Sequence, residues 1–228
     1  IVPWQMLCEK TGATMKVIPM TEIGELSIAE FTRLLSEKTK LVFVNHVSNT
    51  LGTINPIKII IDKAHEKGAA VLIDGAQATS HLIPDFQKLN VDFYVTSAHK
   101  MCGPTGVGIL YGKEKWLQEL PPYQGGGEMI KEVSFEKTTY ADLPHKFEAG
   151  TPNIAGGIAF GAAVDYLNSI GLKDIAIYEN ELLKYATKEL LKIDGVKIYG
   201  TSSNKTAVIS FNIDKIHPYD IGTIIDKL

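Results

Sequence analysis

Short apolar runs alternate with amphipathic segments along the first half of the chain. The runs are rich in β-branched or aromatic residues and are typical of buried strands. They cover residues 15–19, 41–47, 70–73, 91–96 and 107–111. Strands that alternate with helices form βαβ units, and such units build a sheet whose faces helices cover. The pattern therefore predicts an α/β fold with a mostly parallel sheet.

Local signals place the helices between these runs. Ser27 and Glu30 have the spacing of a capping box, which predicts a helix from there to about residue 38. Asn55 and Pro56 start a second helix, and Gly68 ends it.

The second half of the chain has a different pattern. Periodicity fails over residues 121–153, which are rich in glycine and proline, and irregular stretches of that length are usually functional or disordered. Helical patterns follow at 154–170 and 173–193, then strand-like runs at 196–199 and 207–213, and then a helix that starts near Asp220. The change near Gly171 predicts a large domain over residues 1–170 and the start of a small α/β domain over 171–228. We expect both to be incomplete, because the chain looks cut at both ends.

Composition narrows the choice of partners. The 228 residues are 45% hydrophobic and 21% charged, which suits one large core with a second small lobe. Lys plus Arg is 23 and Asp plus Glu is 26, so the net charge of −3 gives no electrostatic reason to expect nucleic acid or an anionic membrane. Apolar stretches also stay well below the ~20 residues of a membrane span. Small molecules and proteins are the expected partners.

Asp74 is the first candidate for chemistry. It closes the apolar run 70–73, so it would lie at the carboxyl end of a strand, where α/β folds bind ligands. A carboxylate there can pair with a protonated pyridine nitrogen. By itself, an aspartate before Gly75 would more often be a turn or helix-capping residue. Lys100 makes the first interpretation the better one.

Lys100 lies between two predicted strands, in a polar turn that a glycine-rich return follows. A lysine amine in such a place can form a Schiff base with a carbonyl group, although most lysines are surface residues. Ser97 and His99 flank it, and their hydroxyl and imidazole groups suit a phosphate. Amine, carboxylate and phosphate donors together are what pyridoxal 5'-phosphate (PLP) requires.

Other cofactors are weaker fits. Residues 103–108 contain glycines but match neither a nucleotide-binding Walker loop nor a dinucleotide fingerprint. The remaining histidines have no metal-ligand spacing, so we expect no metal site.

The two cysteines, Cys8 and Cys102, are too few for a disulfide framework and fit a reducing compartment, with cytoplasm as the expected location. Cys8 would share one face of a helix with Trp4 and Leu7 and pack in the core. Cys102 follows the lysine closely, but we expect it to be a small buried hydrophobic residue. Neither is our candidate for a nucleophile.

The segments 74–77 (Asp-Gly-Ala-Gln) and 97–100 (Ser-Ala-His-Lys) resemble class V aminotransferase-like PLP enzymes of fold type I, and more closely the Suf-type (group II) cysteine desulfurases. The likeness extends over essentially the whole chain. It continues, in order, at residues 1–5, 46–52, 103–106, 125–130 and 147–153.

The resemblance implies a role for each matching residue. Lys100 would hold the cofactor covalently, Asp74 would pair with the pyridinium, and Gln77 would hydrogen-bond the phenolic oxygen. Ser97 and His99 would bind the phosphate. Asn49 would lie near the substrate carboxylate. Thr151 would reach the phosphate of the neighbouring subunit's cofactor, so the resemblance implies a homodimer.

The resemblance also implies a reaction. L-cysteine, or L-selenocysteine, would be converted to L-alanine while the sulfur passes to an enzyme cysteine as a persulfide, for delivery through a sulfur-acceptor protein to iron-sulfur cluster assembly. By motif order, that nucleophilic cysteine and the arginine for the substrate carboxylate would lie beyond Leu228.

Two alternatives remain open. The chain could be another class V aminotransferase-like enzyme, with amino-group transfer in place of desulfuration. It could also be a non-catalytic fragment that keeps the fold without turnover, in which case it would fail to bind PLP.

Overall fold

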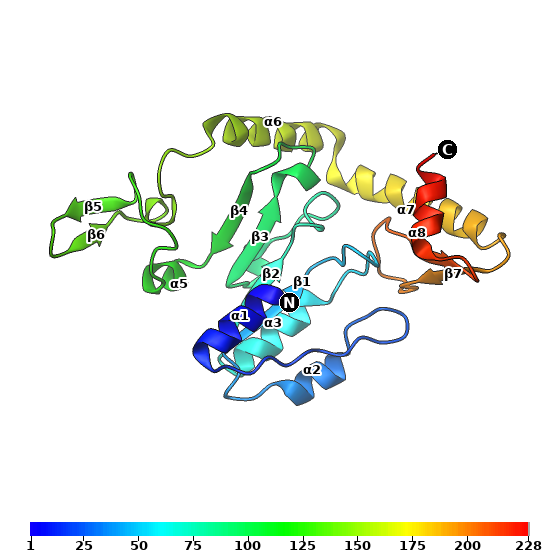
Figure 1. Cartoon of the computed structure of the whole chain (residues 1–228), viewed down its shortest axis with the longest axis horizontal. Helices are drawn as coiled ribbons and strands as arrows, with labels where there is room; N and C mark the ends of the chain where they lie inside the picture. Colours follow the sequence, from blue (N-terminus) through cyan, green and yellow to red (C-terminus); the bar gives the residue numbers. More distant parts are fainter. Residues whose placement is uncertain (228) are drawn as a thin grey trace.

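The computed structural model describes residues 1–227, so Leu228, the last residue of the predicted terminal helix, lies outside the described part. Its centre is a four-stranded sheet in the order β1-β2-β3-β4 (Figure 1). The first three strands are parallel and β4 returns antiparallel to β3. The strands are β1 (Leu41–Asn45), β2 (Ala70–Asp74), β3 (Phe93–Ser97) and β4 (Gly108–Gly112). The prediction of a mostly parallel sheet is confirmed.

Alternating burial shows why the first strands form. Val42 and Val44 of β1 are buried, whereas Phe43 between them points to the opposite face. The valines share a core with three helices, α2 (Ile28–Leu34), α3 (Ile57–Glu66) and α4 (Phe86–Leu89). On the other face, Trp4 of α1 (Val2–Thr11) packs against Phe43, with ring centroids 4.9 Å apart. Helices therefore lie on both faces of the sheet.

The helix signals are confirmed with small changes. The Ser27 side chain accepts a hydrogen bond from the Glu30 amide and caps α2, which ends at Leu34 and not near residue 38. Only half of the capping box forms, because the Glu30 carboxylate pairs with Arg33. Helix α3 begins after Pro56, and Gly68 follows its end with φ of 70°.

Two predictions for the first segment are wrong. Residues 15–19 form no strand; Val17 is 71% exposed, and the backbone there has no neighbouring strand with which to pair. Helix α1 contributes no buried residue: Leu7 is exposed and Cys8 is partly exposed, so the expected core packing holds only for the contact of Trp4.

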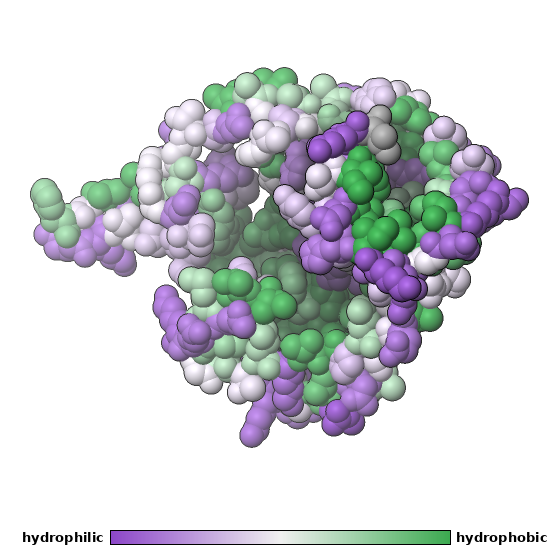
Figure 2. Space-filling view, turned by 45° about the vertical axis from the view of Figure 1, so that its right-hand side comes forward, coloured by the Kyte–Doolittle hydropathy of each residue, from purple (hydrophilic) through white to green (hydrophobic). Residues whose placement is uncertain are grey.

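The stretch after β4 contains more regular structure than the sequence predicts. Helix α5 (Glu114–Glu119) is followed by an antiparallel hairpin of β5 (Ile130–Val133) and β6 (Thr138–Tyr140), then by a short 3-10 turn, η2 (His145–Phe147). The hairpin projects as a narrow arm from the body of the molecule (Figures 1 and 2). Phe135 at its turn is fully exposed. Part of the stretch 121–153, which we expected to be irregular, is therefore a protruding hairpin with apolar side chains.

The last part begins with two long helices, α6 (Ile154–Ile170) and α7 (Leu172–Leu190). Beyond them, β7 (Val196–Tyr199) and β8 (Ser210–Ile213) pair antiparallel as a separate sheet, and α8 (Pro218–Ile225) contacts β8. Helix α6 runs across the end of β3 (Figure 1), where Phe160 and Ala163 pack on Ala98. This contact brings α6 against the loop that carries Lys100.

Candidate active site

The carboxyl ends of β1, β2 and β3 meet at one edge of the sheet, because these strands run parallel. In the register, Asn45 lies opposite Asp74, and Asp74 lies opposite Val95. Ser97 ends β3 at the same edge. Open α/β sheets bind their ligands here. The structure therefore brings the strand ends with Asp74 and Ser97 together, as the sequence predicts.

A tight turn fixes the Asp74 carboxylate. Its Oδ1 accepts a hydrogen bond of 2.9 Å from the Ala76 amide, and the Gly75 amide donates to the carbonyl of Val95 on β3. Gln77 follows in the same turn and is partly exposed. Position 75 requires glycine, because a Cβ atom there would lie 1.9 Å from the ring of Tyr94. Packing between adjacent strands thus sets the direction of the turn.

Behind this turn is a buried pair that the sequence did not predict. Nδ1 of His46 and the hydroxyl of Tyr94 are hydrogen-bonded at 2.9 Å, and the His46 amide donates to the carbonyl of Asp74. Burial lowers the pKa of His46 to about 4, and burial together with the charge of Asp74 raises the pKa of Tyr94 above its usual range. Both side chains are therefore neutral near pH 7. The one available signal for His46 was a polar residue near the end of the predicted strand 41–47.

Lys100 ends the 3-10 turn η1 (Ala98–Lys100), and a closed loop holds this turn. The amide of Ala98 donates to the carbonyl of Val107, and the carbonyl of Ala98 accepts from the amides of Met101 and Gly103. A Cβ at position 103 would lie 2.9 Å from that carbonyl oxygen. The loop is therefore tied at both ends, while the Lys100 side chain stays partly exposed.

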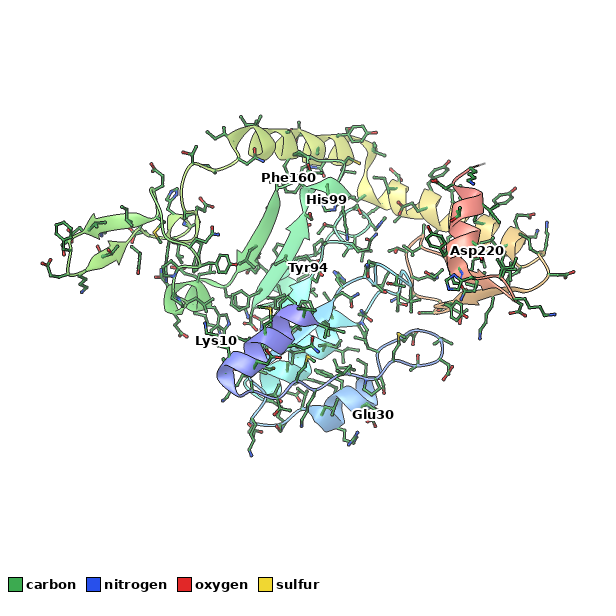
Figure 3. The ribbon with its side chains drawn as sticks, in the orientation of Figure 1. Lys10, Glu30, Tyr94, His99, Phe160 and Asp220 are labelled. Atoms are coloured by element: carbon green, nitrogen blue, oxygen red, sulfur yellow. The ribbon has the colours of Figure 1, made fainter. Side chains whose placement is uncertain are left out.

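Ser97 and His99 form the polar group beside the lysine. The Ser97 hydroxyl and Nδ1 of His99 lie 2.8 Å apart in a hydrogen bond. His99 is exposed and lies at the α6 end of the sheet, whereas Tyr94 lies deeper along β3 (Figure 3). A hydrogen bond of 2.6 Å between the hydroxyls of Thr79 and Thr96 joins the segment after Gln77 to the end of β3. This hydrogen bond links the turn that carries Asp74 to the loop that carries Lys100.

Asn49 and Thr151 stand apart from this group. Asn49 is exposed at the tip of a turn that follows β1, at the same edge of the sheet. Thr151 is exposed shortly before α6 begins. Throughout residues 1–227, no hydrogen bond links either side chain to Asp74 or Lys100. Their predicted roles stay predictions.

Cys102 differs from its predicted burial. Its backbone has φ of 58° and the residue is exposed, because the glycine-rich return turns its side chain away from the core. In the described part of the chain, no three His, Cys, Asp or Glu side chains converge in a way that could hold a metal ion. Nor does any helix within residues 1–227 have the length and apolarity that a membrane span needs.

The donor set fits PLP in its chemistry. Asp74 offers a carboxylate from β2, Lys100 offers an amine from η1, and Ser97 with His99 offers a hydroxyl and an imidazole from the end of β3. These groups match a pyridine nitrogen, an aldehyde and a phosphate respectively.

Comparison with known proteins decides the family. The sequence profile of the aminotransferase class-V family matches residues 1–228. This chain belongs to the class V aminotransferase family. Among curated members, a cysteine desulfurase of Enterobacter sp. (strain 638) is 51% identical over 228 residues, and a probable cysteine desulfurase of Streptomyces coelicolor is 47% identical over 229. The comparison covers 100% of this chain but 56% and 55% of those proteins, so the chain spans little more than half of their length.

Solved structures of the same class share the fold. The cysteine desulfurase CsdA from Escherichia coli superimposes with a TM-score of 0.94 at 32% identity, and an apo cysteine desulfurase from Thermococcus onnurineus NA1 gives 0.93 at 34%. Each comparison covers 100% of this chain, and 56% and 57% of the solved chains respectively. The fold of this class V chain is therefore that of PLP-dependent cysteine desulfurases.

Proposed function

We propose that this class V chain is part of a PLP-dependent cysteine desulfurase, which converts L-cysteine to L-alanine and transfers the sulfur to an enzyme thiolate as a persulfide. One observation carries the proposal. A carboxylate, an amine and a phosphate-binding pair occupy one edge of the sheet in a chain that is about half identical to cysteine desulfurases along its whole length.

Bound PLP supplies an electron sink for bonds at the substrate's α-carbon. The chain's own residues would bind and orient the cofactor and the substrate. Asp74 would keep a proton on the pyridine nitrogen, because its carboxylate is fixed in the turn below that edge. The Lys100 amine would hold the cofactor and move the proton of the substrate's α-carbon at its Nζ.

The remaining predicted residues would complete binding. Ser97 and His99 would bind the phosphate, and Gln77 would donate to the phenolic oxygen. Asn49 would orient the substrate carboxylate. Thr151 would reach the phosphate in a second copy of the chain, which makes a homodimer part of the proposal. The exposed apolar hairpin in the stretch before Thr151 supports such an interface.

We extend the proposal to the finer features that the sequence motifs suggest. These are membership of the Suf-type (group II) subgroup, a cytoplasmic location, L-selenocysteine as a further substrate, and a sulfur-acceptor protein that feeds iron-sulfur cluster assembly. We also propose a domain boundary at Gly171, the residue between α6 and α7, which has φ of 95°. Neither Cys8 nor Cys102 is proposed as the sulfur acceptor.

The test is borohydride reduction of the protein after incubation with PLP, followed by peptide mass mapping. We expect one phosphopyridoxyl group, on Lys100. We expect none on Lys115, an exposed lysine of α5 that serves as an internal control. Asp74→Asn should weaken PLP binding and alter the absorption spectrum of the bound cofactor. Labelling scattered over surface lysines would contradict the proposal.

A second assay separates the open alternatives. L-cysteine incubated with a PLP-loaded protein that contains this chain together with the acceptor cysteine, in the presence of a thiol reductant, should yield alanine and sulfide in equal amounts. Transfer of the amino group to a keto acid, without release of sulfide, would instead indicate another class V enzyme. Specific PLP binding without either product would indicate a protein that keeps the cofactor site without turnover.

A further inference from the structure

The turn that carries Asn49 makes hydrogen bonds to a segment about 150 residues later in the chain. The turn itself is closed by the Gly52 amide, which donates to the carbonyl of Ser48 at 2.8 Å. Its tip, however, is exposed, and Asn49 makes no backbone pairing with the sheet. The position of Asn49 therefore depends on what holds the outer side of the turn.

Residues 204–210 hold that outer side. The Thr206 amide donates to the carbonyl of Gly52 at 2.9 Å, and its hydroxyl donates to the same oxygen at 3.3 Å. The amide of Ile54 donates to the carbonyl of Asn204 at 2.9 Å. The Ser210 hydroxyl donates to the carbonyl of Thr50, the residue next to Asn49.

Close packing shows that this contact is specific. Gly52 has φ of 75°, and a Cβ there would lie 2.9 Å from both the carbonyl oxygen of Thr206 and Cβ of Val208. Gly200 approaches Leu51 in the same way: a Cβ atom added at Gly200 would lie 2.7 Å from Cβ of Leu51. The turn and the later segment could not approach this closely with larger residues at either glycine.

We propose that residues 204–210 are a positioning clamp for the substrate-binding turn, with Ser210 and Thr206 as its positioning residues. The second lobe would thereby control where Asn49 stands relative to Asp74 and Lys100. This inference rests on the proposed role of Asn49 in binding the substrate carboxylate.

The first test needs no activity. Ser210→Ala removes the hydrogen bond to Thr50, and Thr206→Val removes the hydroxyl but keeps the shape and the amide. Hydrogen exchange measured by mass spectrometry should be at least about fivefold faster over residues 48–54 in either variant, as expected when a hydrogen bond is lost. Ser203→Ala is the matched control, because Ser203 is exposed directly before this segment. Unchanged exchange over 48–54 would overturn the clamp.

The second test asks whether the clamp acts through Asn49. In the PLP-loaded protein, Ser210→Ala should raise KM for L-cysteine several-fold with a smaller change in kcat, because substrate binding is the step affected. In an Asn49→Ala background, Ser210→Ala should add nothing. A full additional effect in that background would overturn the positioning role. Failure of the unmodified protein to turn over L-cysteine, when it also contains the acceptor cysteine, would contradict the proposed function, while the exchange measurement would still decide the clamp.

Discussion

At the scale of single residues, the turn that carries Asp74 depends on the backbone of Gly75, which lies directly against the ring of Tyr94. Gly75 leaves room for Tyr94, and Tyr94 in turn holds His46 through its hydroxyl. His46 also donates its amide to the carbonyl of Asp74. These three residues therefore fix the position of the Asp74 carboxylate, although none of them can do its chemistry.

Gly75→Ala should destabilise the protein severely, by about 3 kcal/mol or more, because the added methyl group overlaps the buried Tyr94 ring. Gly157→Ala is the control: Gly157 is exposed in α6 with open space around it, and alanine should stabilise the helix by up to about 1 kcal/mol. Urea unfolding measures both. Equal stability of the two variants would contradict the close packing at position 75.

His46 should make stability depend on pH. Burial holds its pKa in the folded protein at about 4, below the value of ~6.5 expected after unfolding. Between these values the unfolded chain binds a proton that the folded chain does not bind, so stability falls as the pH falls from ~6.5 to ~4, by up to about 3 kcal/mol. His46→Gln should be less stable at pH 7 but lose less stability between pH 7 and 4.5. If the stability of both proteins fell equally with pH, folding would not lower the pKa of His46.

At the scale of elements, a second polar group fixes the opposite end of β3. The carboxylate of Asp92 is 2% exposed and accepts hydrogen bonds from four donors, which are the side chains of His65, Lys113 and Trp116 and the amide of Val71. Burial by itself would raise the pKa of Asp92, but these hydrogen bonds together lower it to about 2. The carboxylate thus joins α3, β2 and α5 at the start of β3.

Asp92→Asn should lower the free energy of unfolding by about 2–4 kcal/mol, because the donors around a buried position lose their charged acceptor. In the unmodified protein, Asp92 makes its full contribution to the free energy of unfolding above pH ~4. This contribution is lost as the pH falls towards 2, because folding lowers the pKa of Asp92. Asp62→Asn, on the exposed surface of α3, should change stability by less than about 0.5 kcal/mol. Thermal unfolding of the three proteins at pH 7 checks the ranking.

The elements that the sequence predicts best are those with a strong local signal. The apolar run 70–73 followed by Asp74 predicted both β2 and the polar group at its end. The turn after β3 predicted Lys100, Ser97 and His99 together, because these residues are neighbours in the sequence. Helix α6 was predicted with its observed bounds, since its apolar run is long and Gly171 ends it.

Features that depend on distant partners were not predictable in this way. The pairing of His46 with Tyr94 requires the register of two strands, which no local pattern gives. Residues 15–19 have the composition of a strand but no strand beside them. The β5–β6 hairpin was missed because its exposed residues show no apolar alternation. The sequence therefore predicts which residues form the candidate site, and their roles stay predictions; the contacts that support them could not be predicted from it.

At the scale of the whole molecule, apolar side chains are exposed far from the core. Phe135 and Val133 lie on the projecting hairpin, and Ile154 and Ile158 lie on the outer face of α6. Exposed apolar surface of this kind marks interfaces between proteins. Helix α6 begins three residues after Thr151, the residue that we propose to act across a homodimer, and Gly150 beside it donates a hydrogen bond to Gly127, which lies shortly before β5.

Phe135→Asp should therefore weaken the proposed homodimer. We expect light scattering after gel filtration to give twice the chain mass of 25.0 kDa for the unmodified protein and a mass nearer to one chain for the variant. Ile83→Asp, at an isoleucine that is 68% exposed elsewhere, should leave the mass unchanged. A variant that dimerises as well as the unmodified protein would exclude the hairpin from the interface, and an unmodified monomer would contradict the homodimer.

The contact between residues 50–54 and 204–210 has a consequence during synthesis. The Asn49 turn leaves the ribosome well before the clamp does, because about 150 residues separate Ile54 from Asn204. At translation rates of about 5–20 residues per second, the gap lasts roughly 8–30 seconds. Strands β2, β3 and β4 are synthesised within that interval, so the nascent sheet can form before residues 204–210 exist. The carbonyl groups of Thr50, Gly52 and Ile54 can therefore bond only to water until residues 204–210 cover the turn.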